Sequence, residues 1–276
     1  MKFREITAAD LPTLPALLSE GFPSTSPGFW TKALDVLSRR PPVDGMPRYG
    51  IVMDDGGDLC GVMLMVAQRR GAATFCNLSS WYVRPAHRGY APFMFGHALK
   101  AEDVTFLDCS PTPDVVPIVE KHGFEPYSGG SLMLDARAAV RRGPKVARLT
   151  AQALEECRHP EAARIAENIR YGCRGMLAHD ADGAPVPILY RVARVKRHIP
   201  VARFVYGAPE TILAHAGAIA RHLIARGVPL ALVDWPVGAE APTGRMLPDY
   251  GVRYKRGADT LPLGDLLDTE YALFGI

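Results

Sequence analysis

The sequence predicts an α/β protein with two related domains in tandem, each built on a mixed β-sheet. Its 276 residues are 48% hydrophobic and 22% charged, which is enough apolar material for two buried cores and too much for a disordered chain. Strand-like runs alternate with helix-like runs along the sequence, as is typical of this class. The order of these runs in the first half then recurs in the second half as a weak internal repeat.

The first half alternates strands and helices and closes with short strands. Strands are indicated by short apolar or alternating runs, and helices by apolar residues three and four positions apart. The expected elements are a strand at 3–7, a helix opening at Ala8-Ala-Asp10 and running through Phe22, a helix at 28–38, a hairpin of 49–53 and 59–68, a strand at 73–83, a helix to about 100, a strand at 104–109, a helix at 114–122, and strands at 124–126 and 131–134. This order predicts a first domain over residues 1–136.

The second half repeats this order after a basic connector. We expect the connector at 137–149 and the second domain at 150–276. The expected elements of the second domain are a helix at 161–171, a hairpin of 175–179 and 186–197, a strand at 201–206, a helix at 209–225 and a strand at 229–234. Two apolar strands, Phe106-Leu-Asp and Leu232-Val-Asp, are each followed by a proline and then by an aromatic-rich strand, which indicates the repeat.

Charge limits the expected partners. The formal net charge is only +3, and the basic residues are scattered, as in the pairs Arg39-Arg40, Arg69-Arg70 and Arg141-Arg142 and in the run 194–198. Such pairs can meet phosphates, but a nucleic-acid binder usually concentrates them in one stripe, so we interpret them as solvated surface. Nucleic acid is therefore not an expected partner, and the sequence carries no signal for an oligomeric state.

The cysteine pattern and the hydropathy indicate a cytoplasmic protein. The five cysteines include no CxxC pair, as expected in a reducing compartment. The N-terminus lacks the apolar core of a signal peptide, and no apolar run reaches the length of a transmembrane helix, so no membrane partner is expected. No metal is expected either, because His215 and His222 share a predicted helix face without a third ligand.

The stretch after the strand at 73–83 has the features of an anion site. A helix that begins directly after a strand exposes unpaired N–H groups, which attract a phosphate together with the helix dipole. Arg88 adds a cation, Gly89 permits close approach of backbone to ligand, and Pro92 suits a first helical turn. These residues predict a pyrophosphate-binding loop that needs no metal.

Two motifs resemble the GNAT superfamily of acyl-CoA N-acyltransferases. Trp81-Tyr-Val-Arg-Pro-Ala-His-Arg-Gly-Tyr-Ala91 is similar to the strand and Arg-Gly-x-Gly loop of that family, and Glu120-Lys-His-Gly-Phe124 is similar to one of its helix ends. The resemblance covers most of the first half. It implies a GNAT fold, acetyl-CoA or another acyl-CoA as co-substrate, and an amine or small molecule as acceptor.

The resemblance also implies roles for individual residues. The residues expected to hold the co-substrate are the backbone of Trp81, Tyr82 and Val83 for the pantetheine arm and the N–H groups of Arg88, Gly89, Tyr90 and Ala91 for the pyrophosphate. The acceptor would lie where the strands ending near Val83 and beginning near Val104 splay apart. In that family a base or a water takes a proton from the amine, the amine attacks the thioester, and backbone N–H groups stabilise the oxyanion.

Ser79 and Asp108 are the candidate catalytic residues. Ser79 could orient a water, and Asp108 could act as a base, although an aspartate at a strand end also serves as a cap. The sequence departs from the family pattern at Val119, where a tyrosine general acid is frequent, at Pro113, where an asparagine is common, and at Phe93, where a small residue lets phosphate approach. Whether the altered loop still binds CoA is left open.

The second half resembles the family only in its order of elements. Its loop, Tyr206-Gly-Ala-Pro-Glu-Thr211, has no Arg-Gly pair, and Glu210 would repel a phosphate. We interpret this half as a degenerate GNAT-like repeat without a cofactor. Three functions remain: an acyl-CoA-dependent acyltransferase, a non-catalytic GNAT-like regulator or binding protein, and a tandem transferase of the kind that uses aminoacyl-tRNA.

Overall fold

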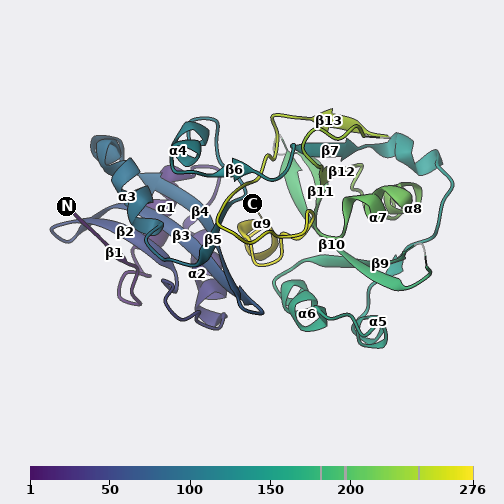
Figure 1. Ribbon diagram of the computed structural model, residues 1–276, viewed down its shortest axis with the longest axis horizontal. Coiled ribbons are helices and arrows are strands. Elements are labelled where there is room, and N and C mark those ends of the chain that lie inside the picture. Colours follow the sequence, from purple (N-terminus) through teal and green to yellow (C-terminus); the bar gives the residue numbers. More distant parts are fainter. Residues whose placement is uncertain (181, 196–197, 242, 276) are drawn as a thin grey trace. The chain divides into compact units, whose positions relative to one another are not determined.

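The structure is a computed structural model that describes residues 1–180, 182–195, 198–241 and 243–275 (Figure 1). The chain forms two compact units. The first contains Met1–Glu125 and Tyr254–Thr260, and the second contains Pro126–Arg253 and Leu261–Ile276. Each unit has a seven-stranded sheet, and both sheets combine parallel and antiparallel neighbours, which confirms the predicted class of two α/β domains in tandem.

The first unit packs its helices against a sheet of strand order β1-β2-β3-β4-β5-β14-β6. Its strands are β1 (Lys2–Glu5), β2 (Gly50–Asp55), β3 (Asp58–Arg70), β4 (Ala73–Val83), β5 (Val104–Asp108), β6 (Glu125–Pro126) and β14 (Tyr254–Arg256). Its helices are α1 (Leu14–Gly21), α2 (Pro27–Arg39), the 3₁₀ helix η1 (Pro85–Tyr90), α3 (Ala91–Ala98) and α4 (Val116–Lys121). Because β4 and β5 run parallel, their carboxyl ends meet at the same edge of the sheet.

Local sequence explains the elements that were predicted most closely. Ser26 caps α2 by accepting a hydrogen bond from the Phe29 N–H at 3.3 Å, and Pro27 occupies the first turn of the helix. The β2–β3 hairpin turns at Gly56 and Gly57, whose φ angles are +66° and +105°. Glycine adopts such angles without a steric penalty, so the turn signal in the sequence led to the correct hairpin.

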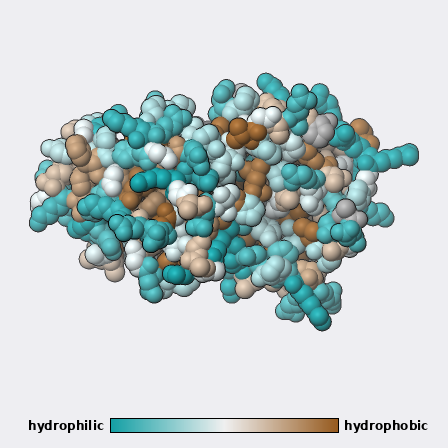
Figure 2. Space-filling view, in the orientation of Figure 1, coloured by the Kyte–Doolittle hydropathy of each residue, from teal (hydrophilic) through white to brown (hydrophobic). Residues whose placement is uncertain are grey.

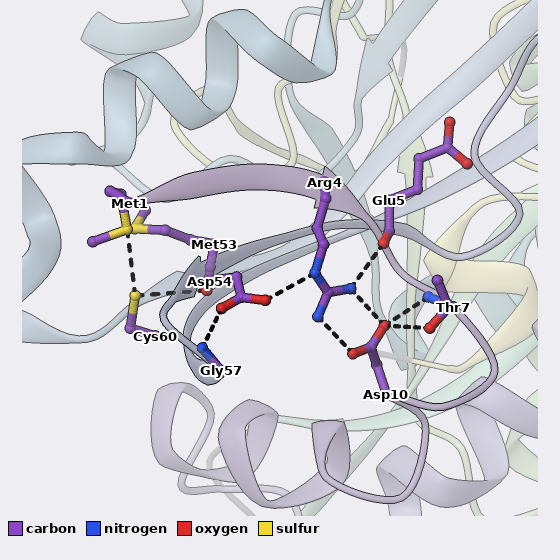
Figure 3. Close-up of polar contacts among 9 residues, drawn as sticks. All are labelled: Met1, Arg4, Glu5, Thr7, Asp10, Met53, Asp54, Gly57 and Cys60. Carbon is purple, nitrogen blue, oxygen red and sulfur yellow. Dashed lines mark hydrogen bonds and ion pairs between the residues drawn. The ribbon is translucent and has the colours of Figure 1, made fainter.

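The first expected helix begins only at Leu14, because Asp10 holds the turn before it (Figure 3). The Asp10 carboxylate accepts hydrogen bonds from the backbone N–H and the hydroxyl of Thr7, both at 2.8 Å. The Arg4 guanidinium donates to both Asp10 oxygens at 2.8 Å and to Asp54 at 2.9 Å. The Arg4 guanidinium therefore holds the pKa of Asp10 well below its usual range. This cluster joins β1, the turn before α1 and the β2–β3 hairpin.

The second unit is built on a sheet of strand order β13-β7-β12-β11-β10-β9-β8. Its strands are β7 (Ser131–Leu134), β8 (Ala147–Arg148), β9 (Arg174–His179), β10 (Pro185–Val195), β11 (Ile199–Tyr206), β12 (Leu230–Asp234) and β13 (Arg245–Leu247). Its helices are the 3₁₀ helix η2 (Ala136–Val140), α5 (Ala151–Glu156), α6 (Ala162–Arg170), α7 (Pro209–Ala214), α8 (Ala216–Ile224) and α9 (Glu270–Leu273). As in the first unit, two of its strands, β11 and β12, run parallel.

The helix expected over 209–225 is divided into α7 and α8 at His215. The backbone of His215 leaves helical geometry, with φ −102° and ψ 11°, and its Nδ1 lies 2.9 Å from the carbonyl oxygen of Thr211. The imidazole ring of His215 is therefore buried inside the second unit, where it contacts the protein's own backbone. Lys196 and Arg197, which end another expected strand and belong to the basic run, lie outside the described residues.

The limits of the two units differ from the expected domain limits. Strand β7, expected at the end of the first domain, pairs with β12 in the second sheet. Conversely, β14 from the second half pairs with β5 in the first sheet. Leu132 and Leu134 of β7 are buried in the apolar core of the second unit, which explains why this strand belongs there. The expected connector, 137–149, also contributes residues to η2 and β8.

Each unit has an apolar core. In the second unit the core includes Met176, Ile188, Tyr190, Phe204 and Trp235. Figure 2 shows hydrophilic residues over most of the visible face, with small apolar areas between them. Within the described part of the chain, no helix is long and apolar enough to cross a membrane.

Candidate functional site

An irregularity of the first unit's sheet lies at the carboxyl end of β4. The β4–β5 ladder ends at the pair Leu78↔Asp108, so the β5-facing backbone of Ser79–Val83, here named the first edge, lies beyond that ladder. A register shift against β3 and a positive φ of 53° at Ser80 bend the strand at this point. Non-glycine residues adopt this conformation rarely, and it concentrates at functional positions. The first edge can therefore offer backbone groups to an extended ligand.

Arg84 anchors the loop that follows β4. Its guanidinium donates to Glu20 at 2.9 Å and to Asp58 at 3.0 and 3.1 Å. Its backbone N–H donates to the carbonyl oxygen of Cys60 at 2.9 Å. The hydrogen bond from Arg84 holds the pKa of Glu20 below its usual value. The start of the loop is thus positioned by α1 and by the β2–β3 hairpin.

The loop itself forms η1, which runs directly into α3. The His87 N–H donates to the carbonyl oxygen of Arg84 at 2.8 Å, and the Ala91 N–H donates to that of Arg88. These two N–H groups are engaged within the loop, whereas the sequence predicted free donors from Arg88 to Ala91. The Arg88 side chain is exposed and has no hydrogen bond or ion pair with any residue that the structure describes. A phosphate would meet this guanidinium first and would compete with 3₁₀ bonds for the N–H groups.

The remaining residues of the loop and of the start of α3 differ in whether packing within the protein explains them. Pro92 occupies the first turn of α3, as predicted. A Cβ added at Gly89 would meet nothing within 4 Å, so only a ligand close to the backbone would require glycine there. Tyr90 and Phe93 are 47% and 67% exposed. The ring of Phe93 therefore extends into solvent at the rim of the loop and does not fill the core.

Two buried ring nitrogens, on the first edge and on the loop after it, are left without a partner by the residues that the structure describes. Trp81 Nε1 and His87 Nδ1 make no hydrogen bond with the residues that the structure describes. The Trp81 ring packs on Phe95 with centroids 5.1 Å apart, in an aromatic group that continues to His122 and Phe124. Buried polar groups are nearly always hydrogen-bonded in folded proteins. Trp81 belongs to the first edge and His87 to the loop after it, so both of these nitrogens lie on the segment that the sequence predicts as the binding site.

Ser79 and Asp108 lie at the same end of the sheet, but they point to different faces. Both are buried, with 4% and 8% exposure. Asp108 is paired with Leu78, and Ser79 follows Leu78, so the alternation of a strand directs the two side chains to opposite faces. Ser79 Oγ lies 3.0 Å from Ser80 Oγ, and Asp108 accepts a hydrogen bond from the Ser110 N–H at 3.3 Å. A base and a water-orienting hydroxyl can therefore act from the two sides of the strand ends.

Tyr254 is a candidate residue that sequence reasoning missed. It is the cross-strand partner of Asp108 on β14, and its hydroxyl lies 3.4 Å from Glu120 Oε1 on α4. Its side chain is 7% exposed, while Val119, which stands where the family's tyrosine is frequent, is completely buried. Burial, with Glu120 and Asp108 nearby, raises the pKa of Tyr254 above its usual value. Its hydroxyl therefore keeps its proton at neutral pH. The run 249–254 is the aromatic-rich strand expected after Leu232-Val-Asp, but nothing in its residues indicates that it pairs with β5.

The second unit has a counterpart of the first edge, and the chain itself covers it. The parallel β11–β12 ladder ends before the stretch Phe204–Gly207, here named the second edge. There the carbonyl oxygen of Val205 accepts a hydrogen bond from the Leu266 N–H at 2.9 Å, and the Gly207 N–H donates to the carbonyl oxygen of Gly264 at 3.2 Å. Backbone groups that could meet a ligand are thus bonded to the protein's own chain.

The segment that covers the second edge, 261–275, is firmly anchored. Arg164 forms an ion pair with Asp268 at 3.0 Å, and the Arg253 guanidinium donates to the Tyr271 hydroxyl at 2.8 Å. Most of the segment's side chains are buried. An extended ligand could not pair with the second edge while this segment covers it.

The described residues offer no obvious metal centre. Within them, no group of three or more His, Cys, Asp or Glu side chains is arranged to hold a metal ion. His215, one of the two histidines considered, directs its ring to protein backbone instead: its Nδ1 contacts Thr211, and its Nε2 lies 3.5 Å from the His179 backbone nitrogen.

Solved structures of other proteins have the same fold as this chain. The chain is similar to a GCN5-related N-acetyltransferase from Anabaena variabilis, with 13% identity and a TM-score of 0.60 over 92% of this chain and 72% of that one. It is similar to a putative acetyltransferase from Pyrococcus horikoshii, with 12% identity and a TM-score of 0.56 over 96% and 92% of the two chains. A tandem GNAT protein from the clavulanic acid biosynthesis pathway matches with 16% identity and a TM-score of 0.54 over 94% and 99%.

These identities are low, so the likeness concerns the fold. No sequence-family model matches the chain, and no curated protein sequence does either. The chain has the GNAT fold twice, in tandem, as predicted from the two motifs of its first half and from the repeated order of elements in its second half.

Proposed function

We propose that the protein is an acyltransferase that moves an acetyl or other acyl group directly from acyl-CoA to an amine or another small acceptor. The observation that carries this proposal is the first edge, which leaves the β4–β5 ladder at the strained Ser80 and leads into a cationic loop. An extended arm with amide groups can bond to such a backbone as an added strand would. The solved structures that are named as acetyltransferases support the same class of reaction.

The residues at this end of the sheet can divide the reaction among them. The backbone of Trp81–Val83 would hold the pantetheine arm, and Arg88 would hold the pyrophosphate. The acceptor nitrogen attacks the thioester carbonyl carbon and loses its proton to water or to Asp108. The C–S bond then breaks, and the hydroxyl of Tyr254 gives its proton to the departing thiolate. Ser79, on the face of the sheet opposite to Asp108, would orient the water that accepts the proton of the acceptor nitrogen.

A second function, non-catalytic binding by a GNAT-like protein, is favoured by one observation. The His87 and Ala91 N–H groups are engaged within η1. A loop whose donors are already bonded would hold a pyrophosphate weakly and mainly through Arg88. Measurement of binding and of turnover on the same protein separates the two functions.

Calorimetric titration with acetyl-CoA tests the proposal through Arg88. We expect wild type to bind and Arg88→Gln to bind roughly ten- to a hundredfold more weakly, because a charge-assisted hydrogen bond contributes about 1.5–3 kcal/mol. The matched control is Arg69→Gln, which removes another exposed arginine of the same unit. Its affinity should equal that of wild type.

Three outcomes would contradict parts of the proposal. If wild type does not bind acetyl-CoA or longer acyl-CoAs at millimolar concentration, a CoA-dependent function is wrong. If Arg88→Gln binds as well as wild type, the pyrophosphate lies elsewhere. If the protein binds acetyl-CoA but releases no CoA with any amine in a broad panel, the non-catalytic function is the correct one.

A further inference from the structure

The second unit contains a cavity of about 440 Å³ that the proposed acyl transfer does not use. Its wall includes Arg141, Arg142, Glu210, Leu213 and Trp235. Glu210 belongs to α7, which follows β11, and Trp235 directly follows β12. The cavity therefore lies at the carboxyl ends of two parallel strands, which is where open α/β sheets bind their ligands.

The backbone that carries the two arginines is fixed by α8. The Arg221 guanidinium donates to the carbonyl oxygens of Ala139 and Arg141 at 2.6 and 3.0 Å. A Cβ added at Gly217 would lie 2.1 Å from the Arg141 carbonyl oxygen, so the chain packs directly on the helix at this point. The base of the Arg141 side chain is thus held in place beside the cavity, and Arg142 is the next residue of the chain.

Three charged side chains of the cavity have no partner in the described part of the chain. Arg141, Arg142 and Glu210 are exposed, and none of them forms a side-chain hydrogen bond or ion pair with a residue that the structure describes. Two positive charges and one negative charge leave the wall with a net charge of +1. Apolar surface lies beside them, because Leu213 and the buried ring of Trp235 line the same cavity.

The surroundings limit the kind of ligand that fits. An extended pantetheine-like arm has no backbone to bind, because the segment 261–275 already covers the second edge. A phosphate would be repelled by Glu210. A guanidinium matches a carboxylate in geometry and charge, whereas a carboxylate such as that of Glu210 matches an ammonium group. The ligand should therefore be compact and should carry both kinds of charge.

We infer that this cavity binds a small acidic amino acid, with its carboxylates on Arg141 and Arg142 and its ammonium group on Glu210. Such a ligand carries a net charge of −1, which balances the net charge of the wall. The volume lies within the range of small-molecule sites, roughly 300–1,000 Å³. All of the lining residues belong to the second unit, so the inference does not depend on acyl transfer in the first.

Titration of the full-length protein tests this site with L-glutamate, N-acetyl-L-glutamate and inorganic phosphate as probes. Arg142→Gln should weaken both amino-acid probes by roughly tenfold, because it removes a carboxylate partner. Glu210→Gln should weaken L-glutamate by roughly tenfold but should not weaken N-acetyl-L-glutamate, which has no ammonium group. The matched controls, Arg174→Gln and Glu155→Gln, change exposed residues outside the cavity wall and should bind like wild type.

The pattern across probes and variants decides the outcome, after thermal unfolding has verified that each variant is folded. The inference is overturned if wild type binds no L-glutamate at millimolar concentration. It is also overturned if phosphate binds as tightly as L-glutamate, since the cavity would then be a simple anion site. Equal loss of both amino-acid probes in Glu210→Gln would exclude the contact with the ammonium group and would overturn it as well.

Discussion

The first edge and the second edge occupy corresponding places in the two units, yet the chain treats them in opposite ways. At Ser79–Val83 a bulged strand leaves its ladder and is followed by an exposed arginine at position 88. At Phe204–Gly207 the backbone is hydrogen-bonded to the segment 261–275. One fold can therefore present a strand end to a ligand or cover it with its own chain, so the fold alone does not make a site.

The covering of the second edge depends on a buried cluster. Arg253 is 1% exposed and Asp234 is 4% exposed, and the guanidinium contacts both carboxylate oxygens at 3.0 and 3.1 Å. The guanidinium also lies over the Tyr271 ring at 4.4 Å, and Arg203 lies over the same ring at 4.1 Å. Tyr271 belongs to the covering segment. Its position is therefore tied to the end of β12 by Arg253.

The largest effect is expected from Arg253→Met, which breaks this cluster. The substitution leaves Asp234 buried without its cation and removes the hydrogen-bond donor to Tyr271. Loss of one member of a buried ion pair typically costs about 3–5 kcal/mol, so the free energy of unfolding of the second unit should fall by that amount. Denaturant unfolding followed by circular dichroism measures the change.

Arg203→Met is the matched control for this prediction. Arg203 stacks on the same ring but is only half-buried, so its removal should cost about 1 kcal/mol. If the two variants lost equal amounts of unfolding free energy, the ion pair with Asp234 would not stabilise the second unit beyond the stacking on Tyr271. The covering segment would then have to be held by its backbone contacts.

Tyr254→Phe tests the first edge and should have the next largest effect. If Tyr254 protonates the departing thiolate, its loss should lower kcat roughly 100-fold and leave KM for acetyl-CoA unchanged. The pKa of this tyrosine is raised above its usual value of about 10. Deprotonation of its hydroxyl should therefore not lower the activity of wild type below that pH. Steady-state kinetics with a competent amine provides the measurement.

The control for this variant is Tyr49→Phe, which removes the hydroxyl of another tyrosine in the same unit that is also 7% exposed. It should keep the kcat of wild type. A loss of less than threefold in Tyr254→Phe would contradict its assignment as the proton donor. The proton would then come from water, and the proposed transfer itself would survive.

The fold was predictable from the sequence where local signals determine structure. Ser26 and Pro27 mark the start of α2, and Gly56 and Gly57 mark the β2–β3 turn, because each residue acts on the backbone around it. The ladder partners were not predictable in this way. Strand β7 carries the same apolar character whichever sheet it joins, so its burial in the second unit depends on contacts distant in sequence.

The candidate site was predictable only in part for the same reason. The segment from Trp81 to Ala91 was recognised from its residues, and it does link β4 to α3. Tyr254 was missed because a long stretch of chain separates it from Asp108, its partner across the ladder. The engagement of the Ala91 N–H was also missed, because a 3₁₀ turn and an open loop require the same kinds of residue. The covering segment has no regular apolar period that would reveal its place.

A second arginine–aspartate cluster, in the first unit, is more exposed and should contribute less to stability. Arg4 binds Asp10 and Asp54 in the first unit (Figure 3), but 35% of its side chain is exposed. Asp10→Asn should therefore lower the free energy of unfolding by only about 1–2 kcal/mol at neutral pH. Asp35→Asn, which breaks an exposed helical pair with Arg39, should cost at most about 0.5 kcal/mol.

The pH dependence of the stability difference between wild type and Asp10→Asn tests whether the ionised Arg4–Asp10 pair is its source. The pKa of Asp10 is lowered in the folded protein by Arg4, so its stabilisation is present above the unfolded pKa of about 4 and is lost as the pH falls below it. Wild type should therefore lose its advantage over Asp10→Asn progressively between pH 4 and lower values. If the difference between the two proteins stayed constant down to the acid transition, the ionised Arg4–Asp10 pair would not be its source. The hydrogen bonds from Thr7 alone would then account for the turn before α1.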